Sequence, residues 1–454
     1  MPEGSDLTKV FFVNSGSEAN DLAMRLAMAH TKGDQWIAVD HAYHGHTAAL
    51  TPLSTYKLRC LKEHEAKGPS YTLDKDELTA PYPNVHICTA PDAYRGPHTG
   101  SLEDEAVGEA YASEVSGIVE RVAAGGQQVA AFIAESMLSC GGQIILPKGY
   151  LQGVYSAVRG AGGVCIADEV QVGFGRVGTH WWAFQQQGVV PDIVTLGKPI
   201  GNGFPLAAVV TTPAIAASFN NGMPYFNTYG GNPVACAAGL AVLRVIKAEG
   251  LMAHAATVGQ ALLEGFRALA EHPEGGQYVG DVRGRGMFVG LELVASRDTK
   301  VPLPRLATAV TRRMRDVHHI LVSTDGPFNN VIKMKPPLAF TAADAAATQA
   351  GLEECLTTLA PEAAKWAARE LVAATGWTVP PHKLLGKGVG GGSRLDLPPP
   401  PSSTSPFPSS ASVVSAGSAA SNPLPRAGMP GAKSYGSLAG LVVPVVEEGR
   451  TAGV

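Results

Sequence analysis

Seven short runs of β-branched and apolar residues, separated by helical patterns, constrain the fold of this chain most strongly. Helices at 18–30 and 233–247 fit between or after these runs, and the second begins with a proline in its first turn. Parallel strands need crossover connections and are buried on both faces, so this alternation predicts an α/β domain with a mostly parallel seven-stranded sheet. The runs are 10–13, 36–39, 85–88, 130–134, 164–167, 193–196 and 206–210.

The pattern changes after residue 248, where longer helices accompany fewer strands. Strands are expected at 287–293 and 331–334, and a last helix at 342–359. We therefore predict a large domain at 1–248 and a smaller α+β domain at 249–375. Residues 376–454 are rich in proline, serine and glycine and cannot bury enough apolar surface to offset chain entropy, so a disordered tail is expected there.

Charge and cysteine usage narrow the class of partner. The formal net charge is −4 and no basic face is concentrated along the chain, which argues against nucleic acid and against an anionic membrane as partners. No apolar run is long enough for a membrane span. The six cysteines are scattered without CxxC spacing, which fits a reducing compartment and leaves the localisation open between cytoplasm and mitochondrion. A small-molecule substrate is expected.

Three segments at the ends of predicted strands carry candidate chemistry. Asn14-Ser-Gly-Ser-Glu-Ala-Asn20 opens a helix, and its free N–H groups suit a phosphate, although a simple helix cap explains it as well. Asp168 follows the strand at 164–167, at the sheet edge where open α/β folds bind ligands. Its carboxylate could face a protonated pyridine nitrogen. Lys198 lies between Gly197 and Pro199, far from other charges, where desolvation could make it a Schiff-base nucleophile.

These segments occur together with Phe226-Asn-Thr-Tyr-Gly-Gly-Asn-Pro233, about 30 residues after the lysine. In this order and spacing the chain resembles the class III aminotransferases, which are fold type I transferases dependent on pyridoxal 5'-phosphate. The resemblance runs from about residue 10 to residue 359. It implies an enzyme with that family's large domain, its smaller C-terminal domain and its two-fold homodimer.

The resemblance also implies which residues hold the cofactor. Gly16 and Ser17 match the phosphate cradle, and Thr228 matches the hydroxyl that reaches the cofactor phosphate of the neighbouring subunit. Each active site would then be shared between two subunits. Tyr43 matches the aromatic ring that stacks on the pyridine, and Val170 the residue that packs on its other face.

Three further residues match positions that take part in the chemistry. Asp168 would keep the ring nitrogen protonated, and Gln171 would hydrogen-bond the phenolic oxygen. Lys198 would form the Schiff base with the cofactor and then act as the base that moves the substrate proton. The expected catalytic residues are therefore Lys198 and Asp168.

Other interpretations compete with this one. Gly173-Phe-Gly-Arg-Val-Gly178 matches a dinucleotide-binding fingerprint, with Asp192 about 20 residues later, but it runs into His180-Trp-Trp182 rather than into a helix. The histidines of His41-Ala-Tyr-His-Gly-His46 lack metal-ligand spacing, so a structural loop around Tyr43 is expected and no metal. A non-catalytic scaffold would be expected to have lost Lys198 or Asp168.

Several motifs contain residues that differ from those of amino-acid transaminases. Many family members hold a substrate carboxylate with an arginine before a Pro-Pro pair, where this chain has Val331-Ile-Lys-Met-Lys-Pro-Pro337 and the matching residue is Lys333. A lysine cannot grip a carboxylate in a bidentate way but can hold a phosphate as a point charge. The stretch Glu135-Ser-Met-Leu-Ser-Cys-Gly-Gly142 replaces the usual Glu-Pro-Ile-Gln-Gly. Glu135 and Lys333 are the candidate substrate-binding residues.

These departures are similar to the ethanolamine-phosphate phospho-lyase branch, close kin of the alanine–glyoxylate aminotransferase 2 group. They predict elimination of phosphate and ammonia from ethanolamine phosphate or a related phosphorylated amine. Transamination to glyoxylate or pyruvate is the alternative, and an NAD-dependent dehydrogenase or an inactive fragment is a further one. The first strand begins almost at once, so the N-terminal segment of the family is expected to be missing.

Overall fold

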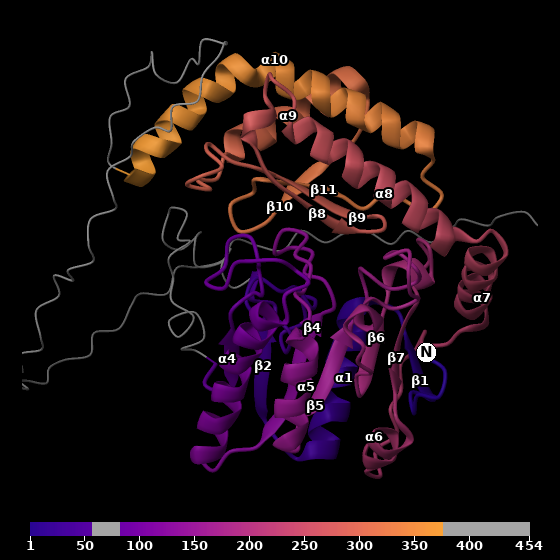
Figure 1. Cartoon of the computed structure of the whole chain (residues 1–454). Coiled ribbons are helices and arrows are strands. Elements are labelled where there is room, and N and C mark those ends of the chain that lie inside the picture. The colour runs from indigo at the N-terminus through magenta and orange to yellow at the C-terminus, as the bar shows by residue number, and fades with distance from the viewer. Residues whose placement is uncertain (57–81, 376–454) are drawn as a thin grey trace, which may run out of the picture. The chain divides into compact units, whose positions relative to one another are not determined.

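The computed structural model describes residues 1–56 and 82–375, and the predicted disordered tail at 376–454 lies outside the described residues. The larger sheet has seven strands in the order β1-β7-β6-β5-β4-β2-β3 (Figure 1). Only β7 among them runs antiparallel to its neighbours, β1 and β6. The prediction of a mostly parallel seven-stranded sheet is confirmed. The strands are β1 (Lys9–Val13), β2 (Gln35–Val39), β3 (Val85–Cys88), β4 (Val129–Glu135), β5 (Val164–Asp168), β6 (Ile193–Leu196) and β7 (Ala207–Thr211).

Helices cover both faces of this sheet, which explains why its central strands are apolar throughout. Successive side chains of a strand point to opposite faces. Ile133 of β4 packs in the core formed with α1 (Gly16–Thr31), and its neighbour Phe132 packs in the core formed with α4 (Glu105–Ala124) and α5 (Tyr150–Gly160). Residues 183–248 also form the helices α6 (Pro213–Ser218) and α7 (Pro233–Ala248) and the 3-10 turns η1 (Ala183–Gln187) and η2 (Lys198–Ile200).

A second, antiparallel sheet is built from residues that follow α7. Its order is β10-β11-β9-β8, and α8, α9 and α10 contribute to the core that covers it. Figure 1 shows these three helices together on the side of this sheet that faces away from the larger one. The elements are α8 (Leu251–Ala270), η3 (Gly276–Tyr278), β8 (Val279–Arg285), β9 (Phe288–Leu293), α9 (Pro304–His318), β10 (Ser323–Asp325), β11 (Val331–Met334) and α10 (Ala342–Thr375). The division into domains after residue 248 stays a prediction.

The last helix is longer than its sequence pattern predicts. The pattern predicts an end at residue 359, whereas α10 continues through Pro361. A proline inside a helix removes one backbone hydrogen bond and costs roughly 3 kcal/mol. Beyond it, Ala363 and Ala367 are fully buried and Trp366 packs against the core of the second sheet, so burial of the following turns offsets this cost.

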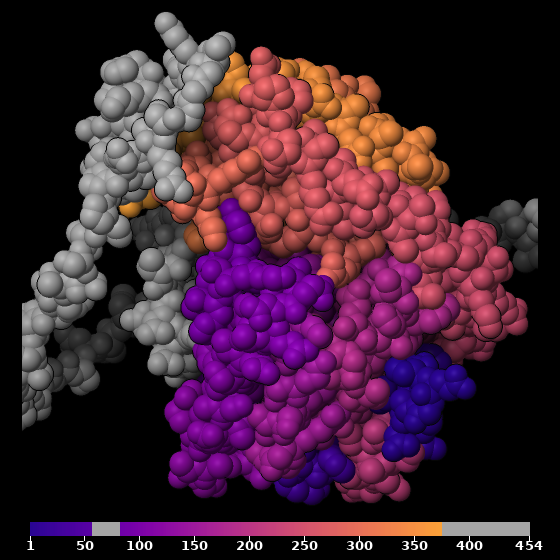
Figure 2. All heavy atoms as spheres, in the orientation of Figure 1, coloured from indigo at the N-terminus to yellow at the C-terminus, as the bar shows by residue number. Residues whose placement is uncertain are grey.

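Loops at the end of the larger sheet contact the second sheet directly. Arg283 of β8 donates to the carbonyl oxygen of Gly142, in the loop after β4, from Nε at 2.9 Å and from Nη2 at 2.6 Å. Figure 2 shows the salmon and orange atoms of the second sheet and its helices directly against the purple and magenta atoms below them. Among the described helices, none is both long and apolar enough to cross a membrane.

The topology brings several strand ends to one edge of the larger sheet. Glu135 ends β4 and pairs in register with Asp168, which ends β5, and Asp168 pairs in turn with Thr195 of β6. Lys198 follows two residues after β6. Because parallel strands present their carboxyl ends on the same side, these side chains share the edge at which open α/β sheets bind ligands.

Candidate active site

A cavity of about 210 Å³ lies at this edge of the larger sheet. It brings together seven of the residues that the sequence indicated as cofactor-binding, from four separate segments of the chain. Segments so distant in sequence meet here because each begins at or near the end of a strand. The residues that line the cavity are Ser15, Gly16, Ser17, Asn20, Tyr43, His44, Gly45, Asp168, Val170, Gln171 and Lys198.

The first wall of the cavity is the N-terminus of α1. Ser15 caps this helix by accepting a hydrogen bond from the N–H of Glu18, and the N–H groups of the first turn have no partner inside the helix. A Cβ at Gly16 would lie 2.8 Å from Cγ1 of Val170, so any larger residue there would have to displace that side chain. The helix end therefore offers donors and a positive dipole end toward the cavity, which is the arrangement that binds phosphate in many proteins.

The floor of the cavity is the carboxylate of Asp168, which is 3% exposed. Its Oδ2 accepts a hydrogen bond from Nδ2 of Asn20 at 2.8 Å and lies 2.9 Å from Nδ1 of His44, and its Oδ1 accepts from the N–H of Val170 at 3.0 Å. No lysine or arginine of the described residues pairs with it. Such a buried carboxylate is well placed to face a cation that a ligand brings.

Sequence reasoning missed the contributions of Asn20 and His44. His44 was expected only to shape a loop around Tyr43, yet its ring contacts Asp168. Asn20 lies one helical turn after Gly16, and this i, i+4 spacing was the available signal that it faces the same cavity. Oδ1 of Asn20 and Nε2 of His44 are buried without a hydrogen-bond partner.

Glu135 organises two loops beside the cavity. Its Oε1 accepts a hydrogen bond from the N–H of Tyr43 and its Oε2 from the N–H of Ser139, both at 3.1 Å. Burial raises the pKa of this carboxyl group to about 7, and the nearby Asp168 adds to the shift while His44 opposes it. Glu135 therefore holds the loop of Tyr43 and the loop after β4 in a fixed relation, but it does not line the cavity.

Lys198 sits at the junction of this cavity and a larger one. Its backbone has φ +33°, an uncommon conformation for a residue other than glycine, and such strain gathers at functional sites. The side chain is exposed, and no described carboxylate lies within ion-pair distance of it. The second cavity, of about 640 Å³, shares Val170, Gln171 and Lys198 with the first and extends to Lys335.

The two lysines before the Pro-Pro pair have different surroundings. Lys333, the predicted substrate-binding residue, forms an ion pair with Asp325 at 2.9 Å and does not line either cavity that contains Lys198. Lys335 lines the larger cavity, and its Nζ donates to Oε1 of Gln171 at 2.8 Å and to Oγ of Ser139. The two lysines are two residues apart, and in an extended chain such side chains point to the same face. The sequence pattern alone therefore could not predict which of them lines the cavity.

Thr228 lies outside both cavities. Its side chain is exposed, on a loop that Asn227 ties to the start of α1. Asn227 accepts a hydrogen bond from Nδ2 of Asn14 at 2.8 Å and donates to Oε2 of Glu18 at 3.2 Å. The single chain thus does not bring Thr228 to Lys198.

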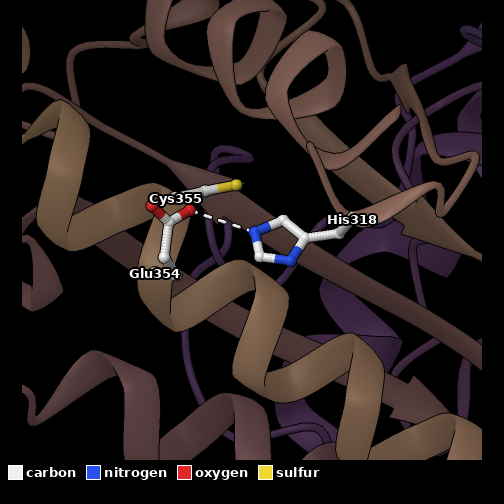
Figure 3. Close-up of side chains that lie close together, drawn as sticks. All are labelled: His318, Glu354 and Cys355. Carbon is white, nitrogen blue, oxygen red and sulfur yellow. Dashed lines mark hydrogen bonds and ion pairs between the residues drawn. The ribbon is translucent and has the colours of Figure 1, made fainter. Parts of the chain in front are cut away.

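The predicted dinucleotide fingerprint and a cluster of possible metal ligands in the second sheet's helices both have a structural explanation. The segment at 173–178 forms a series of turns rather than the start of an α-helix, so it lacks the helix N-terminus that a dinucleotide pyrophosphate requires. His318, Glu354 and Cys355 cluster where α9 meets α10 (Figure 3). The Glu354 carboxylate already accepts hydrogen bonds from Arg313, His318 and Thr358, and these bonds lower its pKa. The cluster therefore holds α9 and α10 together.

The smaller cavity suits the chemistry of pyridoxal phosphate. A helix N-terminus can hold its phosphate, the buried carboxylate of Asp168, which no described lysine or arginine neutralises, can face its protonated ring nitrogen, and Lys198 can supply the amine for its aldehyde. Tyr43 and Val170 are an aromatic and an aliphatic side chain on the lining of the same space. The residues present therefore fit this cofactor.

Comparisons with known proteins agree on one family. A family model described as aminotransferase class III matches residues 1–356. The chain is 51% identical over 377 residues to "Alanine–glyoxylate aminotransferase 2-like" of Drosophila melanogaster, an alignment that covers 83% of this chain and 72% of the relative. It is 43% identical over 360 residues to "Ethanolamine-phosphate phospho-lyase homolog 1" of Caenorhabditis elegans, with 77% and 73% covered. A solved phospholyase from Arthrobacter in complex with phosphoethanolamine has a TM-score of 0.68 and 37% identity, with 78% of each chain covered.

Proposed function

The chain belongs to the class III aminotransferase family, and from this premise we propose that it is a pyridoxal-phosphate-dependent phospho-lyase. Its substrate would be ethanolamine phosphate or a related phosphorylated amine, from which it removes phosphate and ammonia. Support comes from the cavity that joins Lys198 to Asp168, and from the similarity to a phospholyase that was solved with phosphoethanolamine.

The residues of the smaller cavity would divide the binding of the cofactor. Gly16 and Ser17 would donate N–H groups to its phosphate. Tyr43 would stack on one face of the pyridine ring and Val170 would pack on the other. Gln171 would hydrogen-bond the phenolic oxygen, because its Oε1 is already engaged by a lysine and its Nε2 remains free to donate.

The catalytic work of the protein would fall to Asp168 and Lys198. When bound, pyridoxal phosphate supplies an electron sink that acidifies the hydrogen on the carbon bearing the substrate amine. Asp168 would keep a proton at the ring nitrogen, and the contacts of its Oδ2 with Asn20 and His44 fix the orientation of the carboxylate. Lys198 removes the substrate proton at its Nζ, for which it must be neutral.

Elimination then needs no further reactant except water. The C–O bond to phosphate breaks, and its electron pair leaves with the phosphate oxygen. The released enamine takes up one water and gives acetaldehyde and ammonia, so no keto acid is consumed. One observation carries the preference for this reaction: Lys333 stands where the carboxylate-binding arginine of many family members would be, and Lys335, two residues later, lines the larger cavity. Transamination is the second candidate, favoured by the name of the Drosophila relative.

We also propose that two copies of the chain share their active sites. Thr228 lies on an exposed loop and would reach the cofactor phosphate of the partner subunit. The same region presents unusually many exposed apolar side chains for a monomer surface, as expected for an interface. They are Val10, Phe12, Met223, Phe226, Tyr229, Val234, Leu240 and Leu243.

The decisive experiment measures phosphate release and the form of the cofactor together. The purified chain, loaded with pyridoxal phosphate, is expected to release phosphate, acetaldehyde and ammonia from phosphoethanolamine, and Lys198→Ala should release none. Accumulation of pyridoxamine phosphate with an amino donor, with no release of phosphate, would favour the transaminase. Borohydride trapping that leaves Lys198 unmodified would contradict both.

A further inference from the structure

The larger cavity contains an arginine that has no anionic partner. Arg176 lines it together with Lys198 and donates from Nη1 to the backbone oxygens of Met287 at 3.0 Å and Pro336 at 2.8 Å. No carboxylate of the described residues lies within 4.0 Å of its guanidinium. Burial lowers the pKa of Arg176 to about 10, so its charge is poorly compensated.

Lys335 is a second uncompensated cation on the wall of this cavity. Its partners, Ser139 and Gln171, are neutral acceptors, and no described carboxylate pairs with it. Burial lowers the pKa of its ammonium group to about 8, while Asp325 and Glu135 act in the opposite direction from a greater distance. A buried cation without an anion is costly unless a ligand supplies the missing charge.

Other cations between the two sheets do have such partners. Arg283 forms ion pairs with Asp281 at 2.6 Å and with Glu292 at 2.8 Å, and Lys333 pairs with Asp325. The fold therefore compensates cations that lie away from Lys198. The acidic residue that lines the larger cavity, Glu249, is exposed and pairs with neither Arg176 nor Lys335.

We propose that Arg176 and Lys335 together form the site for a phosphate dianion, and that they hold the phosphate group of the substrate beside Lys198. This inference rests on the proposed function and specifies the substrate class. A phosphate monoester carries close to two negative charges at neutral pH and three strong acceptor oxygens, which matches two cations. A carboxylate brings a single charge and would leave one cation unpaired. The site thus selects phosphorylated amines over amino acids.

The same pair assists the elimination. Negative charge grows on the phosphate as the C–O bond breaks, and cations fixed beside it stabilise this charge without having to reorganise. The ties of Arg176 to two backbone oxygens, and of Lys335 to Ser139 and Gln171, hold both cations in place before the substrate arrives.

The test uses the full chain loaded with pyridoxal phosphate, so that the cofactor occupies its own phosphate site. Binding of inorganic phosphate and of acetate is measured by calorimetric titration in the wild type, Lys335→Gln, Lys335→Arg and Lys333→Gln. We expect Lys335→Gln to bind phosphate about 10-fold to 100-fold more weakly, the range for losing a hydrogen bond to a charged group, with little change for acetate. Lys335→Arg should restore most of the affinity, and Arg176→Lys should show an intermediate loss.

Two results would overturn the proposal: phosphate affinity in Lys335→Gln equal to that of the wild type, or an equal loss in Lys333→Gln. Its failure can be separated from that of the lyase assignment. If phosphate binding depends on Lys335 but phosphoethanolamine releases no phosphate, the anion site stands and the lyase fails. If release occurs with an unchanged KM in Lys335→Gln, the lyase stands and the site fails. Thermal unfolding of each variant identifies any that do not fold.

Discussion

Replacing Gly45 with alanine tests how closely the loop at 41–46 must approach the start of α1. Gly45 has φ +126°, and a Cβ at this position would lie 2.6 Å from Oγ of Ser17 and 2.9 Å from its Cα. The substitution therefore combines backbone strain with a steric conflict against the residue expected to bind the cofactor phosphate. The loop can relieve the conflict only by moving away from Ser17.

The magnitude follows from these two terms. A residue forced into such a backbone conformation costs about 1–3 kcal/mol. Overpacking against a fixed neighbour costs about 1–3 kcal/mol more. If only about 2 kcal/mol of this total is expressed as displacement of the loop, the affinity for pyridoxal phosphate falls roughly 30-fold.

A matched control separates strain from contact. Gly126 also has a positive φ, +70°, but a Cβ there would meet nothing within 4 Å. Gly126→Ala should lower the free energy of unfolding by about 1–2 kcal/mol and leave cofactor affinity nearly unchanged. Both variants are titrated with pyridoxal phosphate by absorbance and melted without it. Wild-type affinity in Gly45→Ala, or an equal loss in Gly126→Ala, would refute the reasoning.

Three further outcomes are expected. Glu135 and Glu169 are both buried, and Glu169 accepts hydrogen bonds from the N–H groups of Ala183 and Phe184. Burial raises the pKa of each carboxyl group to about 7, so folding favours the protonated forms, and the stability that this confers should be lost as pH rises from about 4.5 through 7. A melting temperature of the cofactor-free chain that rises over this interval would contradict this. Lys335 loses its charge above a pKa of about 8, so phosphate affinity of the loaded enzyme should fall between pH 7 and 9 and fall less in Lys335→Arg, whereas an unchanged profile would argue against its role. Asn227→Ala should loosen the loop of Thr228 and weaken both dimer formation and cofactor binding, which sedimentation and absorbance titration can check, and an intact dimer of full affinity would oppose this.

The sheet could be predicted from sequence because its signal is local. The run at 130–134 is apolar at every position since both faces of β4 are covered, and the structure extends it by only one residue at each end. The run at 331–334 coincides with β11. Hydrophobic runs of this kind report burial directly, so strand positions follow with little help from distant residues.

The surroundings of single polar residues could not be predicted in this way. Lys333 and Lys335 differ because Asp325, across the β10–β11 pair, neutralises only the first of them. Likewise, nothing next to His44 in sequence indicates that its ring meets a carboxylate 124 residues away. Such contacts depend on tertiary packing, which residue type and spacing do not encode.

The continuation of α10 beyond its proline sets a limit on how far the protein can be trimmed for recombinant work. Residues 360–375 add 16 residues, which span about 24 Å of helix at 1.5 Å per residue. Truncation at 359 would remove Ala363, Trp366 and Ala367 from the core that covers the second sheet. The apolar residues that they cover would then be exposed to water. Such a shortened protein should aggregate or stay bound to chaperones, and its failure would say nothing about the chemistry at the opposite sheet.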